Sequence, residues 1–137
     1  MLRALPPIFT SWVSVATGGA RPHGYQSRLA EQGLPDVLRV PTGTGKTLAA
    51  VLPWLYRRVG HPDTEVRKAT PRWLVIVLPQ RALVEQTVDV IEGWLRNLAL
   101  DVPVHVLMGG EDVGDRDWKS DPERARLPTR CSKPAPT

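Results

Sequence analysis

A glycine loop at residues 41–47 constrains the fold of this 137-residue chain more than any other feature. The loop reads PTGTGKT; a short apolar run, 36–40, precedes it, and apolar residues at helical spacing follow it. Gly43 and Gly45 allow successive backbone N–H groups to turn inward with no side chain blocking an approaching anion. A helix that begins at about Lys46 adds the positive end of its dipole. The pattern predicts a strand, a phosphate-binding loop and a helix.

The two residues that end the loop have the chemistry that a bound nucleotide requires. Lys46 can reach the β and γ phosphates, and the Thr47 hydroxyl can ligate a magnesium ion bound to the same oxygens. The longer form of this motif has a glycine where this chain has Val40. The alternative is therefore that the loop only turns the chain and binds no phosphate. The candidate nucleotide-binding residues are Thr42, Gly43, Thr44, Gly45, Lys46 and Thr47, with Thr47 also the candidate metal ligand.

Segments of strand and helix character alternate along the chain. Residues 72–78 are apolar on both faces and rich in β-branched side chains, which is typical of a buried parallel strand, and residues 104–108 predict a shorter strand. Between them, residues 80–98 carry one apolar stripe at helical spacing. This alternation predicts an α/β fold with a parallel sheet and flanking helices.

Three interruptions of this order are also expected. Pro53 falls inside the helix after the glycine loop and removes one backbone hydrogen bond, so a kink is predicted there. The polar segment 60–71 predicts a loop. Residues 111–137 hold almost no apolar periodicity, and the tail is predicted to be disordered.

Charge and composition restrict the compartment and the partners. The 18 Lys and Arg residues against 14 Asp and Glu give a formal charge of +4, which permits a nucleic-acid partner without requiring one. The single cysteine, Cys131, excludes an internal disulfide and a multi-thiolate metal site. The longest apolar run, 73–78, is far shorter than the roughly 18 residues of a membrane span. We therefore expect a cytoplasmic protein with no membrane partner.

The histidines and tryptophans favour structural roles over chemical ones. The three histidines are scattered without the spacing of metal ligands, and the five tryptophans are expected to pack rather than to stack on bases. These residues are His23, His61, His105, Trp12, Trp54, Trp73, Trp94 and Trp118.

Residues 8–124 resemble the superfamily two DExD/H-box helicases, most closely the helicase part of the CRISPR-associated helicase-nuclease of type I systems. Besides the glycine loop, Tyr25 and Gln26 look like the entry segment in which an aromatic-Gln pair contacts adenine. The resemblance implies that the Gln26 amide pairs with the adenine ring and favours ATP over GTP. The alternative is that Tyr25 and Gln26 only begin a helix.

A second stretch of the likeness follows the strand predicted at 72–78. Residues 79–86, PQRALVEQ, are similar to the helicase pattern PTRxLxxQ, with Gln80 in place of Thr. The resemblance implies that this turn holds a nucleic-acid backbone, and backbone N–H groups at a helix start beside Arg81 suit a sequence-independent phosphate site. The alternative is that Arg81 is a solvated helix residue. A Gly-Gly pair after the third strand resembles another strand-contact element. The implied nucleic-acid-binding residues are Pro79, Gln80, Arg81, Gly109 and Gly110.

The resemblance also implies what this sequence lacks. In the family, an apolar strand and then an Asp-Glu motif that holds magnesium should follow, and neither is present. Glu111 and Asp112 are an alternative acidic pair, but two glycines separate them from the strand, so a solvated turn is preferred. We expect an incomplete RecA-like P-loop domain over residues 1–124 and a disordered tail over 125–137, from a motor cut or frameshifted near 124–126.

The missing segments have a structural consequence in the family's strand order. Two absent strands would lie between 37–40 and 73–78, so each of these strands is expected to have unpaired backbone groups on the side that faces the gap. The isolated chain is then expected to be poorly stable or to pair its strands in another order.

The function that the resemblance implies is that of the ATP-binding and nucleic-acid-binding part of a CRISPR-type antiviral DNA helicase, without hydrolysis of its own. Its cofactors would be ATP and Mg²⁺, and its nucleic acid would be DNA rather than RNA. The rest of a split helicase or a CRISPR surveillance complex would be its protein partner. A stand-alone P-loop interaction module and a gene remnant are the alternatives.

Overall fold

The computed structural model describes residues 8–41, 43, 45–107 and 127–131. The helices are α1 (Phe9–Thr17), α2 (Gly24–Gln32), α3 (Lys46–Leu55), α4 (Thr64–Ala69) and α5 (Arg81–Asn97), with a π-helical turn η1 (Tyr56–Gly60) after α3. The strands are β1 (Ile76–Leu78), β2 (Val104–Leu107) and β3 (Leu127–Cys131). Among the described helices, none has the length and apolar composition needed to cross a bilayer.

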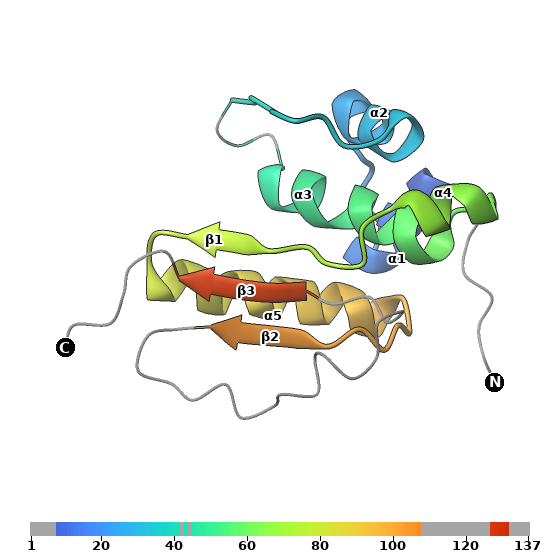
Figure 1. Cartoon of the computed structure of the whole chain (residues 1–137). Coiled ribbons are helices and arrows are strands. Elements are labelled where there is room, and N and C mark those ends of the chain that lie inside the picture. The colour runs from blue at the N-terminus through green and yellow to red at the C-terminus, as the bar shows by residue number, and fades with distance from the viewer. Residues whose placement is uncertain (1–7, 42, 44, 108–126, 132–137) are drawn as a thin grey trace.

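The three strands form one parallel sheet in the order β1-β3-β2 (Figure 1). β3 lies in the middle, with Thr129 opposite Ile76 of β1 and opposite Val106 of β2. The parallel sheet with helices that the sequence predicted is therefore present. The predicted disorder of the tail is wrong for residues 127–131. Because β3 lies between β1 and β2, its backbone can form hydrogen bonds with both of them. This pairing does not depend on an apolar side-chain pattern.

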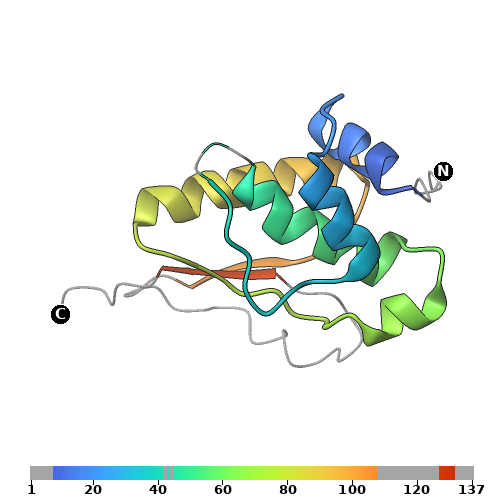
Figure 2. The ribbon, with the colours of Figure 1, turned by 90° about the horizontal axis from the view of Figure 1, so that it is seen from above.

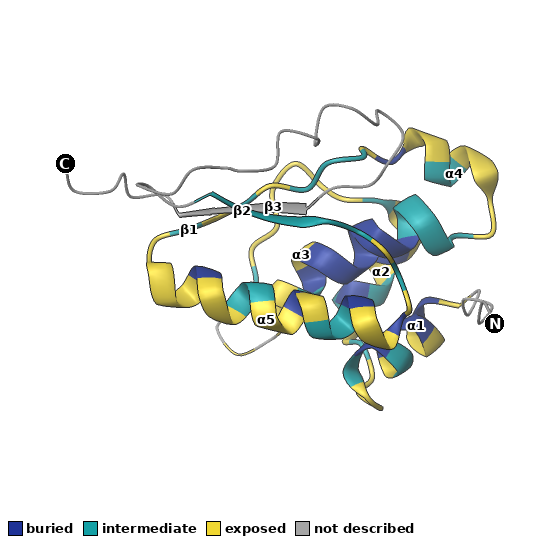
Figure 3. Cartoon of the chain, turned by 90° about the horizontal axis from the view of Figure 1, so that it is seen from below, coloured by how far each residue is buried: buried dark blue, intermediate teal, exposed yellow. Residues whose placement is uncertain are grey.

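One face of the sheet is covered by α5, which packs across all three strands. Its apolar stripe buries Val84, Ile91 and Leu95, as the periodicity over 80–98 predicted. Helices α1 and α3 lie on the same side of the sheet as α5 (Figures 2 and 3). The Asn97 amide at the end of α5 donates to the Ala16 carbonyl at 2.7 Å and joins α5 to α1.

The hydrophobic core lies between α1, α3, η1 and α5. Trp12 and Trp54 are completely buried there, so the prediction that tryptophans pack is confirmed for these two. The rings of Tyr56 and Trp12 meet edge to face, with their centroids 5.6 Å apart. The Tyr56 ring also contacts the Phe9 ring at a centroid distance of 5.5 Å. Burial, with the Glu31 charge second, raises the pKa of the Tyr56 phenol, so the ring in this cluster stays neutral.

Helix α3 continues through Pro53, and its geometry changes only at Tyr56, where the π-helical turn begins. The His61 N–H donates to the Tyr56 carbonyl at 2.7 Å and closes this wider turn. The turn brings Gly60 against the indole of Trp12, where a Cβ at position 60 would lie 2.4 Å from Cζ2. The departure from regular helix thus comes after the proline, where the chain meets Trp12.

Three other sequence expectations differ from the structure. Residues 36–40 form no strand, and the strand expected at 72–78 is shortened to Ile76–Leu78. A parallel strand exists only when it has a paired neighbour, and no described segment pairs with 36–40. The loop expected at 60–71 contains α4, whose N-cap Asp63 accepts a hydrogen bond from the Glu65 N–H at 2.9 Å. That cap is a signal that the sequence already carried.

Candidate nucleotide and nucleic-acid site

The two glycines of the loop have backbone conformations that favour glycine. Gly43 and Gly45 both have positive φ, 82° and 76°, in the left-handed region that favours glycine. Gly45 is the N-cap of α3, and Lys46 is the first residue of this helix. Thr42 and Thr44 lie outside the described residues.

The start of α3 has the electrostatics of an anion site. Its first N–H groups have no partner within the helix, and its first turn carries no acidic side chain. Lys46 and Thr47 are both exposed in this turn, so an ammonium group and a hydroxyl stand beside the free N–H groups. This arrangement can bind a phosphate, and a hydroxyl at Thr47 can reach a cation bound to that phosphate.

Gln26 contacts the glycine loop directly. The side chain is only 1% exposed, and its Nε2 donates to the Gly45 carbonyl at 2.9 Å. Its Oε1 accepts from the His23 N–H at 2.7 Å, which closes the start of α2. A Cβ at position 45 would lie 2.6 Å from this Nε2, so only glycine fits there without displacing the amide. Both ends of the amide are therefore used inside the protein, and pairing with adenine stays a prediction.

Helix α2 is also held at its other end. The Arg57 guanidinium in η1 donates to the Ala30 carbonyl at 2.9 Å and to the Glu31 carbonyl at 3.2 Å. Cations at a helix C-terminus satisfy carbonyls that have no partner within the helix. Gln26 therefore joins α2 to the loop before α3, and Arg57 joins α2 to the turn after α3. No pattern in the sequence predicted either contact, because each joins residues far apart along the chain.

The second candidate site lies at the carboxyl end of β1. Pro79, Gln80 and Arg81 are exposed, and Gln80 is the N-cap of α5 without a capping hydrogen bond from its side chain. The N-terminal ends of α3 and α5 point toward the same end of the molecule as the strand tips (Figures 1 and 2). The structure therefore brings two helix starts to one end. Gly109 and Gly110 lie outside the described residues.

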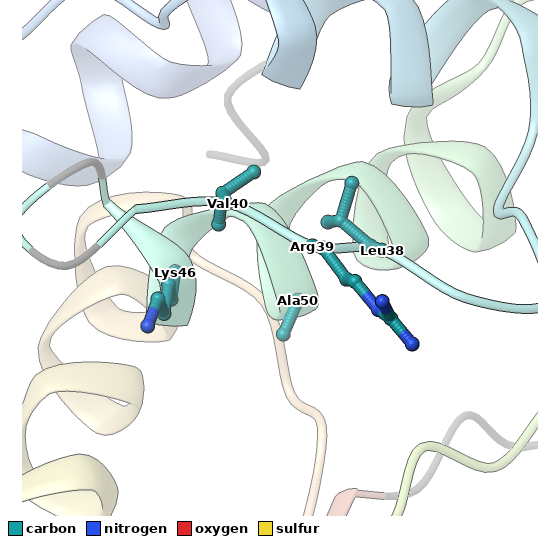
Figure 4. A pocket seen from close by; sticks show the side chains of 5 residues that line it. All are labelled: Leu38, Arg39, Val40, Lys46 and Ala50. Carbon is teal, nitrogen blue, oxygen red and sulfur yellow. The ribbon is translucent and has the colours of Figure 1, made fainter.

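A pocket of about 500 Å³ lies between the segment before the glycine loop and α3 (Figure 4). It is lined by Leu38, Arg39, Val40, Lys46 and Ala50. Arg39 is the residue that the sequence prediction missed, although it is the one charged residue within the apolar run 37–40. Two cationic side chains, Arg39 and Lys46, therefore line the same cavity.

Acidic ligands do not gather beside these cations in the described part of the chain. Within that part, no three His, Cys, Asp or Glu side chains come close enough to hold a metal ion. The alternative acidic pair, Glu111 and Asp112, lies outside the described residues.

Comparison with known proteins identifies the class. The family model described as DEAD/DEAH box helicase matches residues 25–126, a span that holds the glycine loop and the turn at 79–81. The chain therefore belongs to the DEAD/DEAH box helicase family. This confirms the helicase superfamily that the motifs indicated, while the likeness to the CRISPR-associated branch stays a prediction.

One relative shows how similar the chain is to a known helicase and how much of that helicase it covers. The chain is 35% identical over 101 residues to a Bacillus subtilis (strain 168) protein described as "Probable ATP-dependent RNA helicase YfmL". The match covers 72% of this chain and 24% of that protein. The chain thus spans about a quarter of the length of the relative it matches.

Proposed function

We propose that this chain binds Mg-ATP at the start of α3 and a nucleic-acid backbone at the start of α5, as part of an ATP-dependent helicase motor. The observation that carries the proposal is the glycine loop, in which two glycines with positive φ lead directly into an exposed lysine at a helix N-terminus. The nucleotide-binding residues proposed are Gln26, Thr42, Gly43, Thr44, Gly45, Lys46 and Thr47. The nucleic-acid-binding residues proposed are Pro79, Gln80, Arg81, Gly109 and Gly110.

Each proposed nucleotide contact has a distinct chemical role. The N–H groups at the start of α3 would bind phosphate oxygens, and Lys46 would neutralise the charge on the β and γ phosphates. Thr47 would ligate Mg²⁺, which shields the triphosphate when bound. The activity proposed for the described residues is the binding of Mg-ATP.

Lys46→Ala is expected to weaken Mg-ATP binding about 10- to 100-fold, because hydrogen bonds to charged groups contribute about 1.5–3 kcal/mol. The measurement is a calorimetric or fluorescent-nucleotide titration in the presence of Mg²⁺. Lys68→Ala removes an exposed lysine from α4, away from the loop, and is the matched control. Equal affinity for both variants and the wild type would contradict the proposed site.

Arg81→Ala is expected to weaken single-stranded nucleic-acid binding uniformly across sequences and to lower the salt slope of log affinity by about one. Arg96 lies in the last turn of the same helix, so Arg96→Ala is the matched control. The measurement is fluorescence anisotropy over a range of salt concentrations. If only ATP binding is found in the wild type, the chain is a nucleotide-binding module and the nucleic-acid half of the proposal is wrong.

We further propose that the nucleic acid is DNA, as the likeness to the CRISPR-type helicases implies. The relative in Bacillus subtilis is described as an RNA helicase, which gives the opposite expectation. Single-stranded DNA and RNA of equal length and matched sequence, titrated at one salt concentration, separate the two. Tighter binding of RNA would remove the CRISPR-type proposal and leave the helicase proposal standing.

A further inference from the structure

The side chain of His23 accepts a hydrogen bond at the start of α2. His23 is the N-cap of this helix, and its side chain accepts from the Gln26 N–H. The His23 N–H donates in return to Gln26 Oε1 at 2.7 Å. The two residues therefore form a reciprocal capping box, in which each side chain satisfies the main chain of the other. Serine and threonine usually fill the first position of such a box, and here a titratable side chain fills it.

The same capping box is joined to the glycine loop. Helix α2 packs against α3 (Figure 1), and the other end of the Gln26 amide, Nε2, donates to the Gly45 carbonyl at 2.9 Å. The His23 ring lies close to the same residue, because a Cβ at position 45 would be 3.7 Å from its Cδ2. Hydrogen bonds thus connect the His23 imidazole through Gln26 to the N-cap of α3.

A proton on the His23 imidazole is incompatible with this arrangement. An imidazole nitrogen accepts a hydrogen bond only while it carries no proton, and histidine is the side chain whose ordinary titration falls between about pH 5 and 8. The added charge would also lie at the positive end of the α2 dipole, where a cation is unfavourable. His23 is exposed, so solvent can supply the proton.

The neighbouring elements carry no carboxylate that would stabilise an imidazolium at this point. The titratable and charged side chains near His23 are Tyr25 and Arg28 on α2, Arg21 before α2 and Lys46 at the start of α3. The Tyr25 ring stacks on the His23 ring, with the centroids 6.1 Å apart and the planes 10° from parallel. The first turns of α2 and α3 contain no acidic side chain, and α1 contains no titratable one.

We infer that His23 is a positioning residue for the nucleotide site, and that a proton on its imidazole releases Gln26 from the glycine loop and weakens the binding of Mg-ATP. The uncharged imidazole caps α2 and keeps the Gln26 amide against the Gly45 carbonyl. The imidazolium cannot accept the Gln26 N–H, so the start of α2 loosens. The inference rests on the proposed function for its ligand and adds to it that the site is sensitive to pH.

The first test measures Mg-ATP affinity at about pH 8 and about pH 5.5 for the wild type and for His23→Asn. Asparagine accepts the capping hydrogen bond at both pH values, and the ratio of the two affinities removes any titration of the nucleotide itself. The wild type is expected to match His23→Asn at the higher pH. At the lower pH it is expected to bind about three- to tenfold more weakly, because that is what the loss of an N-cap costs.

His23→Phe imitates the protonated state without a change of pH. Phenylalanine keeps an aromatic ring beside Tyr25 but has no hydrogen-bond acceptor. This variant is expected to bind Mg-ATP about three- to tenfold more weakly than His23→Asn at both pH values. Circular dichroism at each pH checks that the proteins are folded. If His23→Phe does not fold, the comparison of the wild type with His23→Asn still decides the inference.

A measurement without nucleotide separates the inference from the proposed function. In an NMR titration of the free protein, the amide signals of Gln26 and Gly45 are expected to shift together with the His23 ring signals as the pH falls. The two amide signals are expected to stay in place in His23→Asn. His61→Asn removes a histidine between η1 and α4 and is expected to keep the wild-type behaviour.

Three results would overturn the inference. An affinity ratio that is equal at both pH values would show that the charge on His23 does not affect the site. Tighter binding by the wild type than by His23→Asn at the lower pH would show that His23 contacts phosphate as a cation. A pH effect that disappears in His61→Asn but persists in His23→Asn would belong to the other histidine. A wild type that binds no Mg-ATP at about pH 8 contradicts the proposed function and, with it, the effect on affinity inferred here.

Discussion

Gly60→Ala is expected to lower the free energy of unfolding by about 3 kcal/mol, the upper end of what overpacking a core costs. The new methyl group would lie 2.4 Å from Trp12 Cζ2 and 2.5 Å from Cε2, closer than a Cβ can approach another atom. The Trp12 side chain of α1 is fully buried and its ring also contacts the ring of Tyr56. The π-helical turn or α1 must therefore shift, and both belong to the core.

The measurement is urea unfolding followed by tryptophan fluorescence and circular dichroism. Gly93→Ala is the matched control, because a Cβ at position 93 in α5 meets nothing closer than 3.9 Å. It is expected to stabilise the protein by about 0.4–1 kcal/mol through the unfolded state. Unchanged stability of Gly60→Ala would mean that η1 does not pack on the indole.

A double-mutant cycle with Trp12→Phe tests the contact between the two residues. The smaller ring removes part of the indole that the methyl would strike, so the double variant is expected to be more stable than the sum of the single effects predicts. Trp12→Phe also deletes an indole N–H that has no acceptor within the described residues. Simple additivity would show that the two sites destabilise the protein independently.

Gln26→Ala is expected to lower the free energy of unfolding by about 3 kcal/mol and to weaken Mg-ATP binding severalfold. The change removes a side chain that is only 1% exposed, together with its hydrogen bonds to the His23 N–H and the Gly45 carbonyl, and an intramolecular hydrogen bond contributes about 0.5–1.5 kcal/mol. It also releases the glycine loop from α2. Unfolding and nucleotide titrations on the same preparation measure both effects.

Two comparisons separate a role in positioning the loop from a general loss of stability. Gln32→Ala changes an exposed glutamine at the end of α2 and is expected to alter neither quantity by much. ATP and GTP titrations of Gln26→Ala then test adenine recognition. A variant that loses the preference for ATP would support the prediction from sequence. Equal weakening of both nucleotides would indicate that Gln26 acts only by holding Gly45.

The sequence predicted the elements whose signals are local. The apolar stripe over 80–98 predicted α5 to within one residue at each end, because helical periodicity is set by residues three and four apart. The glycine pair predicted the loop and the start of α3, because positive φ is a property of single residues. The family followed from the same motifs, since they keep their spacing along the chain.

Elements that depend on distant partners were predicted poorly. Residues 127–131 form the central strand although their sequence carries no strand pattern, because pairing with β1 and β2 supplies their hydrogen bonds. Residues 36–40 have the pattern of a strand and form none, because no described segment pairs with them. The composition of a segment indicates whether it can form a strand when a neighbouring strand is present. Only the assembled sheet decides which segments have such a neighbour.

The sequence by itself determined the chemistry of this protein: a lysine and a hydroxyl after two glycines at a helix start. The tertiary structure alone decided that Gln26 holds Gly45, that Gly60 packs on Trp12, and that Arg39 and Lys46 share one pocket. The physical reason is distance along the chain. Local conformation follows from neighbouring side chains, whereas each of these contacts joins residues that meet only when the helices pack.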